Sequence, residues 1–193
     1  ELPSGIKLID THTFQNCTAL KKVILPSDLT QIGYGAFDSC SSLLEIEIPD
    51  GVEVIGDSAF RCCSSLFKAN IPNALTEIPK DMFTQCVALT ELTMGDKVEI
   101  INDGAFFGCA FASLTLPETL TAINGRPFMQ CNSLYEIINK STLNINLDNV
   151  DDFGIYTSPI KAVVNHEEQS ILRYLDDFVF YENTNGTVYL VKY

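Results

Sequence analysis

Seven cysteines are the residues of this chain best suited to chemistry, because a thiol can ligate a metal, form a disulfide or act as a nucleophile. Six of them recur at nearly even steps, at Cys17, Cys40, Cys63, Cys86, Cys109 and Cys131. A zinc site needs ligands that converge, commonly in short paired spacings, and an even ladder does not provide them. We therefore expect these six to be reduced packing residues that behave as small hydrophobes, with no metal bound.

Cys62 differs from the other six because it lies beside Cys63 and should face outward or toward a neighbouring coil. An incidental, partly exposed thiol is the plainer interpretation, and a functional thiol is the alternative. In the folded protein a thiol reagent should therefore modify at most Cys62 quickly, while the six regularly spaced cysteines stay protected until unfolding.

The other residue types that perform catalysis form no recognisable constellation. His12 and His166 are far apart in sequence, and the chain has no G-x-S-x-G elbow, Gly-rich phosphate loop or metal-spaced histidine pair. Asp148, Asp151 and Asp152 are clustered but lack the glycine and terminal glutamate of a calcium loop, so we expect a solvated loop there. The sequence predicts a protein that is not an enzyme and carries no cofactor.

Composition and charge limit the partner classes. Of the 193 residues, 46% are hydrophobic and 19% are charged, which provides enough apolar material for a core, and the net charge is −13. No basic patch is present, so nucleic acid and anionic membrane surfaces are poor candidates. We expect no membrane insertion within this chain, and any export signal or anchor would lie outside it.

A repeat sets the spacing of the cysteines. A phenylalanine lies three residues before each of the six, at Phe14, Phe37, Phe60, Phe83, Phe106 and Phe128, so the period is 23 residues with one step of 22. Units of this length cannot bury their apolar faces alone and must stack on their neighbours. The missing residue falls near Phe111 and Ala112, where we expect a local irregularity and an unbroken stack.

The second unit shows what each repeat should form. Ile46 and Ile48 alternate with polar residues and are followed by Pro49, which predicts a short strand with these two isoleucines on its buried side. A second short extended piece is expected around Ile32. The stretch Ala36–Cys40 predicts one or two turns of helix, with Cys40 three residues after the phenylalanine.

This unit resembles the BspA-like leucine-rich repeats of bacterial cell-surface proteins over residues 1–139. The Ala-Phe pair of that pattern is complete in three units, at Ala36-Phe37, Ala59-Phe60 and Ala105-Phe106, and is replaced at Thr13, Met82 and Pro127. The resemblance implies an α/β leucine-rich-repeat solenoid of six coils with short parallel strands on a concave face. It also implies a surface-exposed or secreted protein used in adhesion or recognition, without identifying a ligand.

The strand positions that point away from the core form two rows along the expected concave face. One row is Lys22, Glu45, Lys68, Glu91, Ser113 and Glu136, and the other is Ile24, Glu47, Asn70, Thr93, Thr115 and Ile138. Stacked strands place the residues of a row about 4.8 Å apart, so the first row alternates in charge between neighbours. Either it is a self-satisfied salt-bridge ladder that sets register and solubility, or the face is a polar surface that binds a partner.

The last 54 residues, 140–193, are expected to be a non-repeat cap or junction. The sequence predicts a polar loop over 144–158, a strand over 160–164, a short helix over 167–174 and a hairpin that joins Phe178–Tyr181 to Thr187–Val191. The hairpin is apolar on both faces, so one face could cap the solenoid and the other could meet a neighbour. Weak self-association or an interdomain contact is therefore expected through Phe178, Phe180, Tyr189 and Tyr193.

These observations favour a non-enzymatic surface or secreted module that binds a partner protein, with host extracellular proteins as candidates, through the outward strand residues. The two alternatives are a structural spacer within a larger surface protein and a carbohydrate-binding module that uses the aromatic C-terminal segment. Replacing the whole concave face would separate a spacer, which should tolerate the change, from a binder, which should not.

Overall fold

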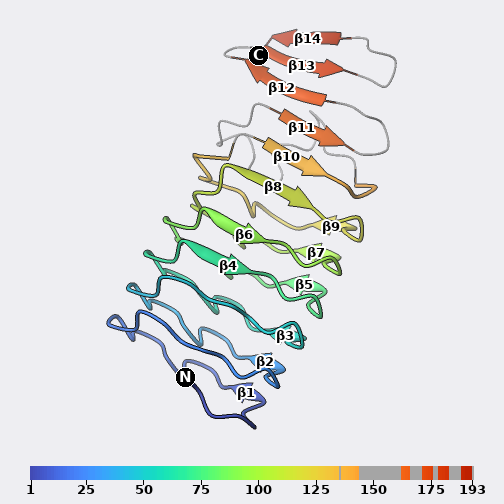
Figure 1. The fold of residues 1–193 in the computed structure, drawn as a ribbon. Helices are drawn as coiled ribbons and strands as arrows, with labels where there is room; N and C mark the ends of the chain where they lie inside the picture. Colours follow the sequence, from blue (N-terminus) through green and yellow to red (C-terminus); the bar gives the residue numbers. More distant parts are fainter. Residues whose placement is uncertain (135, 144–161, 166–170, 176–177, 183–187, 193) are drawn as a thin grey trace.

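The computed structural model describes residues 1–134, 136–143, 162–165, 171–175, 178–182 and 188–192, with backbone alone from residue 162 onward. The repeats wind into stacked coils, which Figure 1 shows as successive layers that rise from the N-terminus. The six coils, numbered in chain order, comprise residues 2–24, 25–47, 48–70, 71–93, 94–115 and 116–138.

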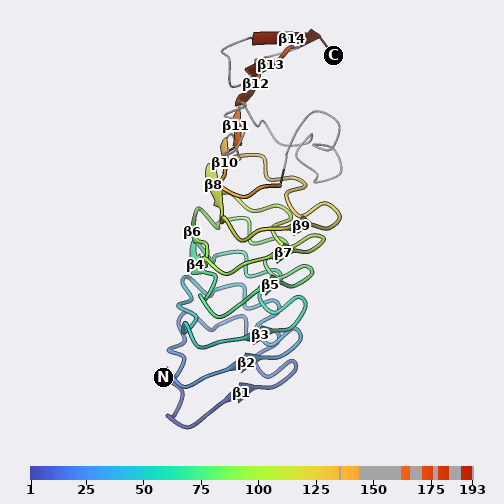
Figure 2. The ribbon, with the colours of Figure 1, turned by 90° about the vertical axis from the view of Figure 1, so that its right-hand side faces the viewer.

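Two rows of short parallel strands run up the solenoid. The front row consists of β4 (Lys68–Asn70), β6 (Glu91–Thr93), β8 (Ser113–Leu116) and β10 (Glu136–Asn139). The side row consists of β1 (Leu8–Ile9), β2 (Gln31–Ile32), β3 (Val54–Ile55), β5 (Glu77–Ile78), β7 (Ile100–Ile101) and β9 (Ala122–Ile123). The side row faces the viewer in Figure 2, and the front row lies along the left edge there. In coils 1–3 the front row continues only as single bridges from Lys22 to Glu45 and from Glu45 to Lys68.

The repeat packs its phenylalanines into one continuous stack. Phe14, Phe37, Phe60, Phe83, Phe106 and Phe128 stack in sequence with ring centroids 5.0–6.2 Å apart and interplanar angles of 15° or less. All but Phe14 are fully buried. Because each coil contributes one ring, removal of a single phenylalanine would leave a gap between two neighbouring coils.

The expected helical turn at each Phe is wrong, and no helix is present in the described part of the chain. Left-handed residues stand two positions before and two positions after the phenylalanine, as with Ser58 (φ 59°) and Cys62 (φ 56°) around Phe60. A right-handed helix cannot pass through such residues, so only a tight turn fits between them. The solenoid is therefore an all-β one, and the α/β label is corrected while the 23-residue parallel architecture is confirmed.

The shortened coil behaves as predicted. The front row is interrupted between β6 and β8, which belong to different sheets, whereas β7 and β9 of the side row remain paired. Phe111 is buried there and meets Phe106 edge-on at 5.7 Å. The missing residue is thus absorbed in the loop before β8, and the core continues through it.

Beyond the coils the sheet continues into four further strands, β11 (Ala162–Asn165), β12 (Ile171–Leu175), β13 (Phe178–Glu182) and β14 (Val188–Lys192). The strand expected over 160–164 is found as β11, parallel to β10, with paired positions 26 residues apart. The short helix expected over 167–174 is wrong in its described part, because residues 171–175 are a strand paired antiparallel to β13. The hairpin is confirmed as the antiparallel pair β13–β14.

Several expectations fall on residues outside the described ranges. They are the loop over 144–158, the acidic cluster at 148–152, His166 and the turn at 183–186. The division of the chain at residue 139, and the assignment of the last segment as a cap or junction, stay predictions. In the described residues there is no helix long and apolar enough to cross a lipid bilayer.

Candidate functional site

The outward side chains of the front row form one surface, here called the strand face. Along each strand the neighbouring residues point inward, and Ile46, Ala69, Leu114 and Ile137 are buried in the core. This alternation follows from the two-residue period of a β-strand, so the sequence could place the outward set correctly. The predicted partner-binding residues on this face are Lys22, Ile24, Glu45, Glu47, Lys68, Asn70, Glu91, Thr93, Glu136 and Ile138.

An open hollow of about 980 Å³ lies over the strand face at the N-terminal part of the solenoid. The predicted residues that line it are Lys22, Ile24, Glu45, Glu47, Lys68, Asn70 and Thr93, and the loop that begins at Pro49 adds Asp50 and Gly51. Glu91, Glu136 and Ile138 lie outside the hollow, in β6 and β10. The sequence predicted the face but could not predict which coils would be hollowed.

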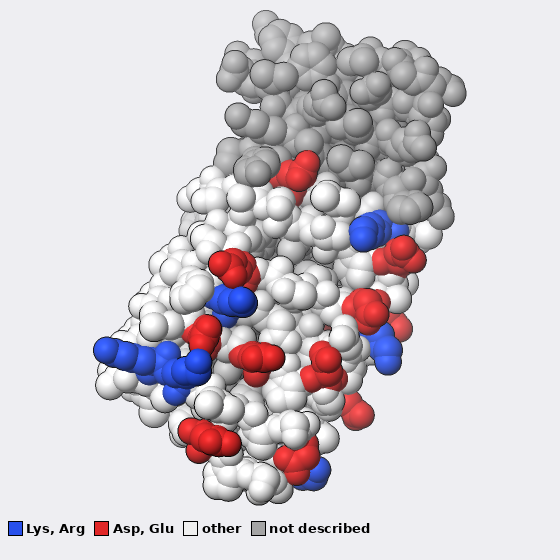
Figure 3. Space-filling model, in the orientation of Figure 1, with Lys and Arg blue, Asp and Glu red and all other residues white. Residues whose placement is uncertain are grey.

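Charges on the strand face are largely paired with each other. Lys22 and Glu45 form an ion pair at 2.6 Å, and Lys68 and Glu91 form another at 3.6 Å. The hydrogen bond from Lys22 lowers the pKa of Glu45 and the same bond raises the pKa of Lys22. The predicted ladder thus exists as two exposed pairs, and Figure 3 shows basic and acidic side chains close together over the coils. Because both partners stay in water, such pairs add little stability.

Asn70 has a structural role that sequence reasoning missed. Its side-chain amide accepts a hydrogen bond from the Ile48 N–H at 2.7 Å and donates one to the Ile48 carbonyl at 2.8 Å. The amide thereby takes the place of a strand-backbone partner for Ile48, the first residue of coil 3. The sequence feature that could have revealed this role is an asparagine at an outward strand position, because its side chain carries the same donor and acceptor as a peptide group.

Ile24 and Glu47 are the most available side chains in the hollow. Ile24 is an apolar residue with 49% of its surface exposed. Glu47 is also exposed, and its charge adds to the effect of Glu45 in raising the pKa of Lys22. The hollow therefore combines an exposed apolar side chain with a carboxylate that forms no ion pair with any described residue.

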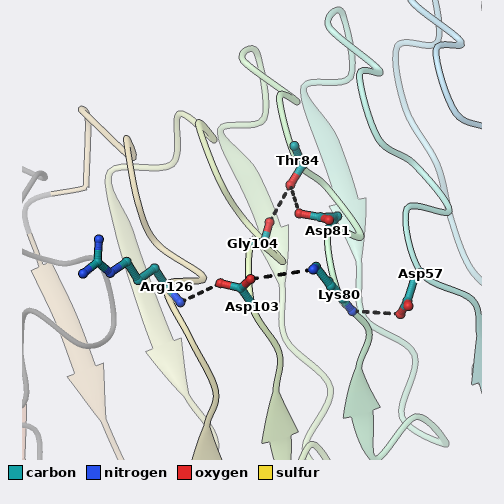
Figure 4. A network of polar contacts seen from close by, with 7 residues as sticks. All are labelled: Asp57, Lys80, Asp81, Thr84, Asp103, Gly104 and Arg126. Carbon is teal, nitrogen blue, oxygen red and sulfur yellow. Dashed lines mark hydrogen bonds and ion pairs between the residues drawn. The ribbon is translucent and has the colours of Figure 1, made fainter.

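A second polar row, shown in Figure 4, crosses the loops that follow the side-row strands. Asp57 accepts from the Lys80 N–H at 3.1 Å, the Lys80 ammonium lies 3.9 Å from Asp103, and Asp103 accepts from the Arg126 N–H at 2.9 Å. The Thr84 hydroxyl donates to the Asp81 carboxylate at 2.9 Å on the same side of the solenoid. These groups satisfy one another from coil to coil, so we interpret the row as a stabilising ladder.

The predicted burial of the six regularly spaced cysteines is correct for five of the six. Cys40, Cys63, Cys86, Cys109 and Cys131 are buried, and each thiol donates a hydrogen bond of 3.0–3.4 Å to the phenylalanine carbonyl of the preceding coil. Burial raises the pKa of Cys40 to about 11 and that of Cys131 to about 12, so both remain neutral thiols. Cys17 corrects the prediction because it is exposed, and Cys62 is partly exposed as expected.

No metal site emerges in the described part of the chain, where no group of three or more His, Cys, Asp or Glu side chains is placed to hold an ion.

Of the predicted C-terminal contact residues, Phe178 and Phe180 lie in β13 and Tyr189 lies in β14. Tyr189 pairs in register with Tyr181. Tyr193 is outside the described residues, and the contact role of all four stays a prediction.

Comparison with known proteins gives one family and several solved structures. The sequence pattern of the BspA type leucine rich repeat region matches residues 1–111 and 99–189 in six copies. A leucine-rich repeat protein from Bacteroides ovatus is 24% identical over 73% of this chain and 49% of its own, with a TM-score of 0.51. A leucine rich cell surface protein from Faecalibacterium prausnitzii is 24% identical over 97% of this chain and 50% of its own, with a TM-score of 0.53.

The leucine-rich repeat protein of T. pallidum is 30% identical over 71% of this chain and 56% of its own, with a TM-score of 0.51. This chain thus spans about half the length of these solved proteins. Among curated proteins no match was found. At 24% identity the first two structures support the fold and leave the ligand open.

Proposed function

This chain belongs to the BspA-type leucine-rich-repeat family, and we propose that it is a non-enzymatic module that binds a partner protein through its strand face. The observation that carries the proposal is the hollow over coils 1–4, because seven of the ten strand-face residues singled out from the sequence line it. A concave, preformed surface on a rigid stack suits recognition, since little ordering is needed when a partner binds.

The composition of the hollow favours a protein surface over a small molecule. It is open and mixed in polarity, with Ile24 and Ala69 beside Lys22, Glu45 and Lys68, and no aromatic side chain lines it. Sites for small ligands are more enclosed and largely apolar, and protein interfaces combine an apolar centre with a polar rim. We assign Ile24 to the centre of the contact and the paired charges to its rim.

A location at the cell surface or outside the cell is part of the same proposal. The family resemblance supports it, and the similar protein from Faecalibacterium prausnitzii is described as a cell surface protein. Adhesion to a host extracellular protein is the specific role we propose. Partner binding on the strand face would need no catalytic group, metal or cofactor.

A matched pair of surface variants tests the proposal against purified host extracellular proteins immobilised for a binding assay. The face variant is Ile24→Asp with Glu47→Arg, and the control is Val54→Asp with Glu53→Arg. Ile24 and Val54 are similarly exposed, at 49% and 52%, but Val54 lies on the side row. We expect binding to at least one protein, weakened about 10-fold or more by the face variant and unchanged in the control.

Equal binding by the wild type and the face variant would contradict the strand-face assignment. If the wild-type chain binds none of the proteins, and replacing the whole strand face leaves cell adhesion intact, the spacer alternative is supported instead. The carbohydrate alternative predicts binding to glycans that persists in the face variant, because its aromatic residues lie in β13 and β14.

A further inference from the structure

The first and last residues of a coil meet at the front row, and in coils 1 and 4 their backbones are hydrogen bonded to each other. The Leu2 N–H donates to the Ile24 carbonyl at 3.0 Å in coil 1, and the Ile71 N–H donates to the Thr93 carbonyl at 2.8 Å in coil 4. This bond continues the parallel ladder of the front row from one strand to the next. Where it is present, the row is closed.

Coil 3 closes the same place with a side chain. The Asn70 amide accepts a hydrogen bond from the Ile48 N–H at 2.7 Å and donates one to the Ile48 carbonyl at 2.8 Å. A primary carboxamide carries its N–H and C=O on one edge, so it can bind both groups of one residue together. A trans peptide group points its N–H and C=O in opposite directions and cannot. The chain itself thus shows which chemical group fits this position.

Coil 2 has neither arrangement. The Leu25 N–H and the Leu25 carbonyl form no hydrogen bond with any described residue, and no described N–H donates to the Glu47 carbonyl. Glu47 stands one repeat before Asn70, and a carboxylate has no hydrogen to donate to the Leu25 carbonyl. Coil 2 therefore holds a donor and an acceptor on one residue without the amide that coil 3 supplies.

This donor and acceptor lie at the hollow that the proposed function uses. Leu25 and Glu47 both line the hollow, together with the half-exposed Ile24. We propose that the Leu25 N–H and carbonyl bind a primary carboxamide, brought by an asparagine side chain of the partner protein, in the way that Asn70 binds Ile48. The inference rests on the proposed function, because it names a side chain that the partner places on the strand face.

The same geometry selects between partner side chains. In the free protein the hollow is open, so water can reach Leu25, and an asparagine replaces that water without leaving either group unpaired. A leucine of similar size in the partner would cover the Leu25 N–H and carbonyl and offer them nothing, which is costly for buried polar groups. The position therefore favours asparagine over an apolar residue of the same shape.

Glu47→Asn tests this geometry within the chain. The introduced amide should bind Leu25 as Asn70 binds Ile48, and it should slow hydrogen exchange of the Leu25 N–H by about 5-fold or more, the factor for one ordinary hydrogen bond. Glu47→Ala removes the carboxylate without supplying an amide, so Leu25 should exchange as fast as in the wild type. NMR measures these rates residue by residue, and in the wild type Leu25 should exchange faster than Ile48 and Ile71.

The binding experiment titrates two tripeptides into the isotope-labelled full chain and follows the NMR signal of the Leu25 amide. One peptide has asparagine between two threonines, and the other has leucine in its place. Both are acetylated and end in an N-methylamide, so neither cap is a primary carboxamide. We expect a saturable shift of the Leu25 signal with the asparagine peptide alone. Glu47→Asn should weaken this response by about 5-fold or more, because its own amide competes for Leu25.

Three results would overturn the inference. One is wild-type exchange of Leu25 as slow as that of Ile71, because the front row would then be closed at coil 2. The second is an equal response to both peptides, or none to either. The third is host-protein binding that the strand-face variant abolishes and Glu47→Asn leaves unchanged. In that case the proposed function stands, and the partner uses the strand face without a carboxamide at Leu25.

Discussion

Removing one ring from the phenylalanine stack tests the packing that holds the solenoid together. Phe60 is fully buried and lies between Phe37 at 5.2 Å and Phe83 at 5.5 Å. Phe60→Ala deletes a large side chain from a site where both neighbours are fixed by their own coils, so the gap cannot close easily. We expect a loss of about 3–5 kcal/mol in the free energy of unfolding. With a urea dependence of about 2 kcal/mol per molar, the midpoint should fall by about 1.5–2.5 M.

Two comparisons make that result specific to burial. Phe14→Ala removes the same side chain from the end of the stack, where its ring stacks on Phe37 on one side and is partly exposed, so about half the loss is expected. Glu47→Ala, on the strand face, should stay within about 0.5 kcal/mol of the wild type. Urea unfolding followed by circular dichroism measures all three. Equal midpoints for Phe60→Ala and Glu47→Ala would refute the assignment of inside and outside.

Three further outcomes can be measured on the same protein. N-ethylmaleimide should modify Cys17 fastest and leave Cys40 unreacted even at pH 9, because burial raises its pKa to about 11; a disulfide between buried cysteines in the mass spectrum would contradict this. Asn70→Ala should cost about 1–3 kcal/mol in urea unfolding, since the Ile48 N–H and carbonyl lose their partners, whereas Thr93→Ala should be close to neutral. Sedimentation should show weak self-association that Tyr189→Asp removes, and a strictly monomeric wild type would exclude that contact.

The sequence predicted the parts of the fold that depend on spacing. A 23-residue period places equivalent residues on top of one another, so the burial of Phe60 and Cys63 followed from the repeat itself. The two-residue alternation of the front row likewise separated Ile46, inside, from Glu47, outside. These inferences need no knowledge of the backbone beyond its periodicity.

The helix prediction was wrong because the left-handed backbone positions that exclude a helix are often occupied by residue types that do not signal such a conformation. Gly104 and Gly108 flank Phe106 with φ of 66° and 74° and would have signalled left-handed turns. The same two positions around Phe83 are Asp81 and Gln85, with φ of 55° and 62°, and glutamine rarely marks such a turn. Only alignment of the coils with one another shows that both pairs share one backbone conformation.

The exposure of Cys17 shows a second limit of repeat reasoning. Cys17 and Cys63 have the same residue type, the same spacing from a phenylalanine and the same place in the unit. Cys63 is buried because coil 2 covers it, and Cys17 is exposed because coil 1 has no coil before it in the structure. Burial in a solenoid therefore belongs to a pair of coils, and a single unit cannot specify it.

How far a strand-face side chain is already engaged within the solenoid decides how much it can contribute to partner binding. Lys22 and Glu45 already satisfy each other at 2.6 Å, so a partner gains little by contacting them and must compete with that pair. Asn70 is held by Ile48 and shapes the hollow without offering a free amide. Ile24 has half of its surface still exposed, and covering it would contribute about 1 kcal/mol from apolar burial alone. Affinity on this face should thus follow Ile24 and its neighbour Glu47, while the charged ladder sets the alignment of the partner.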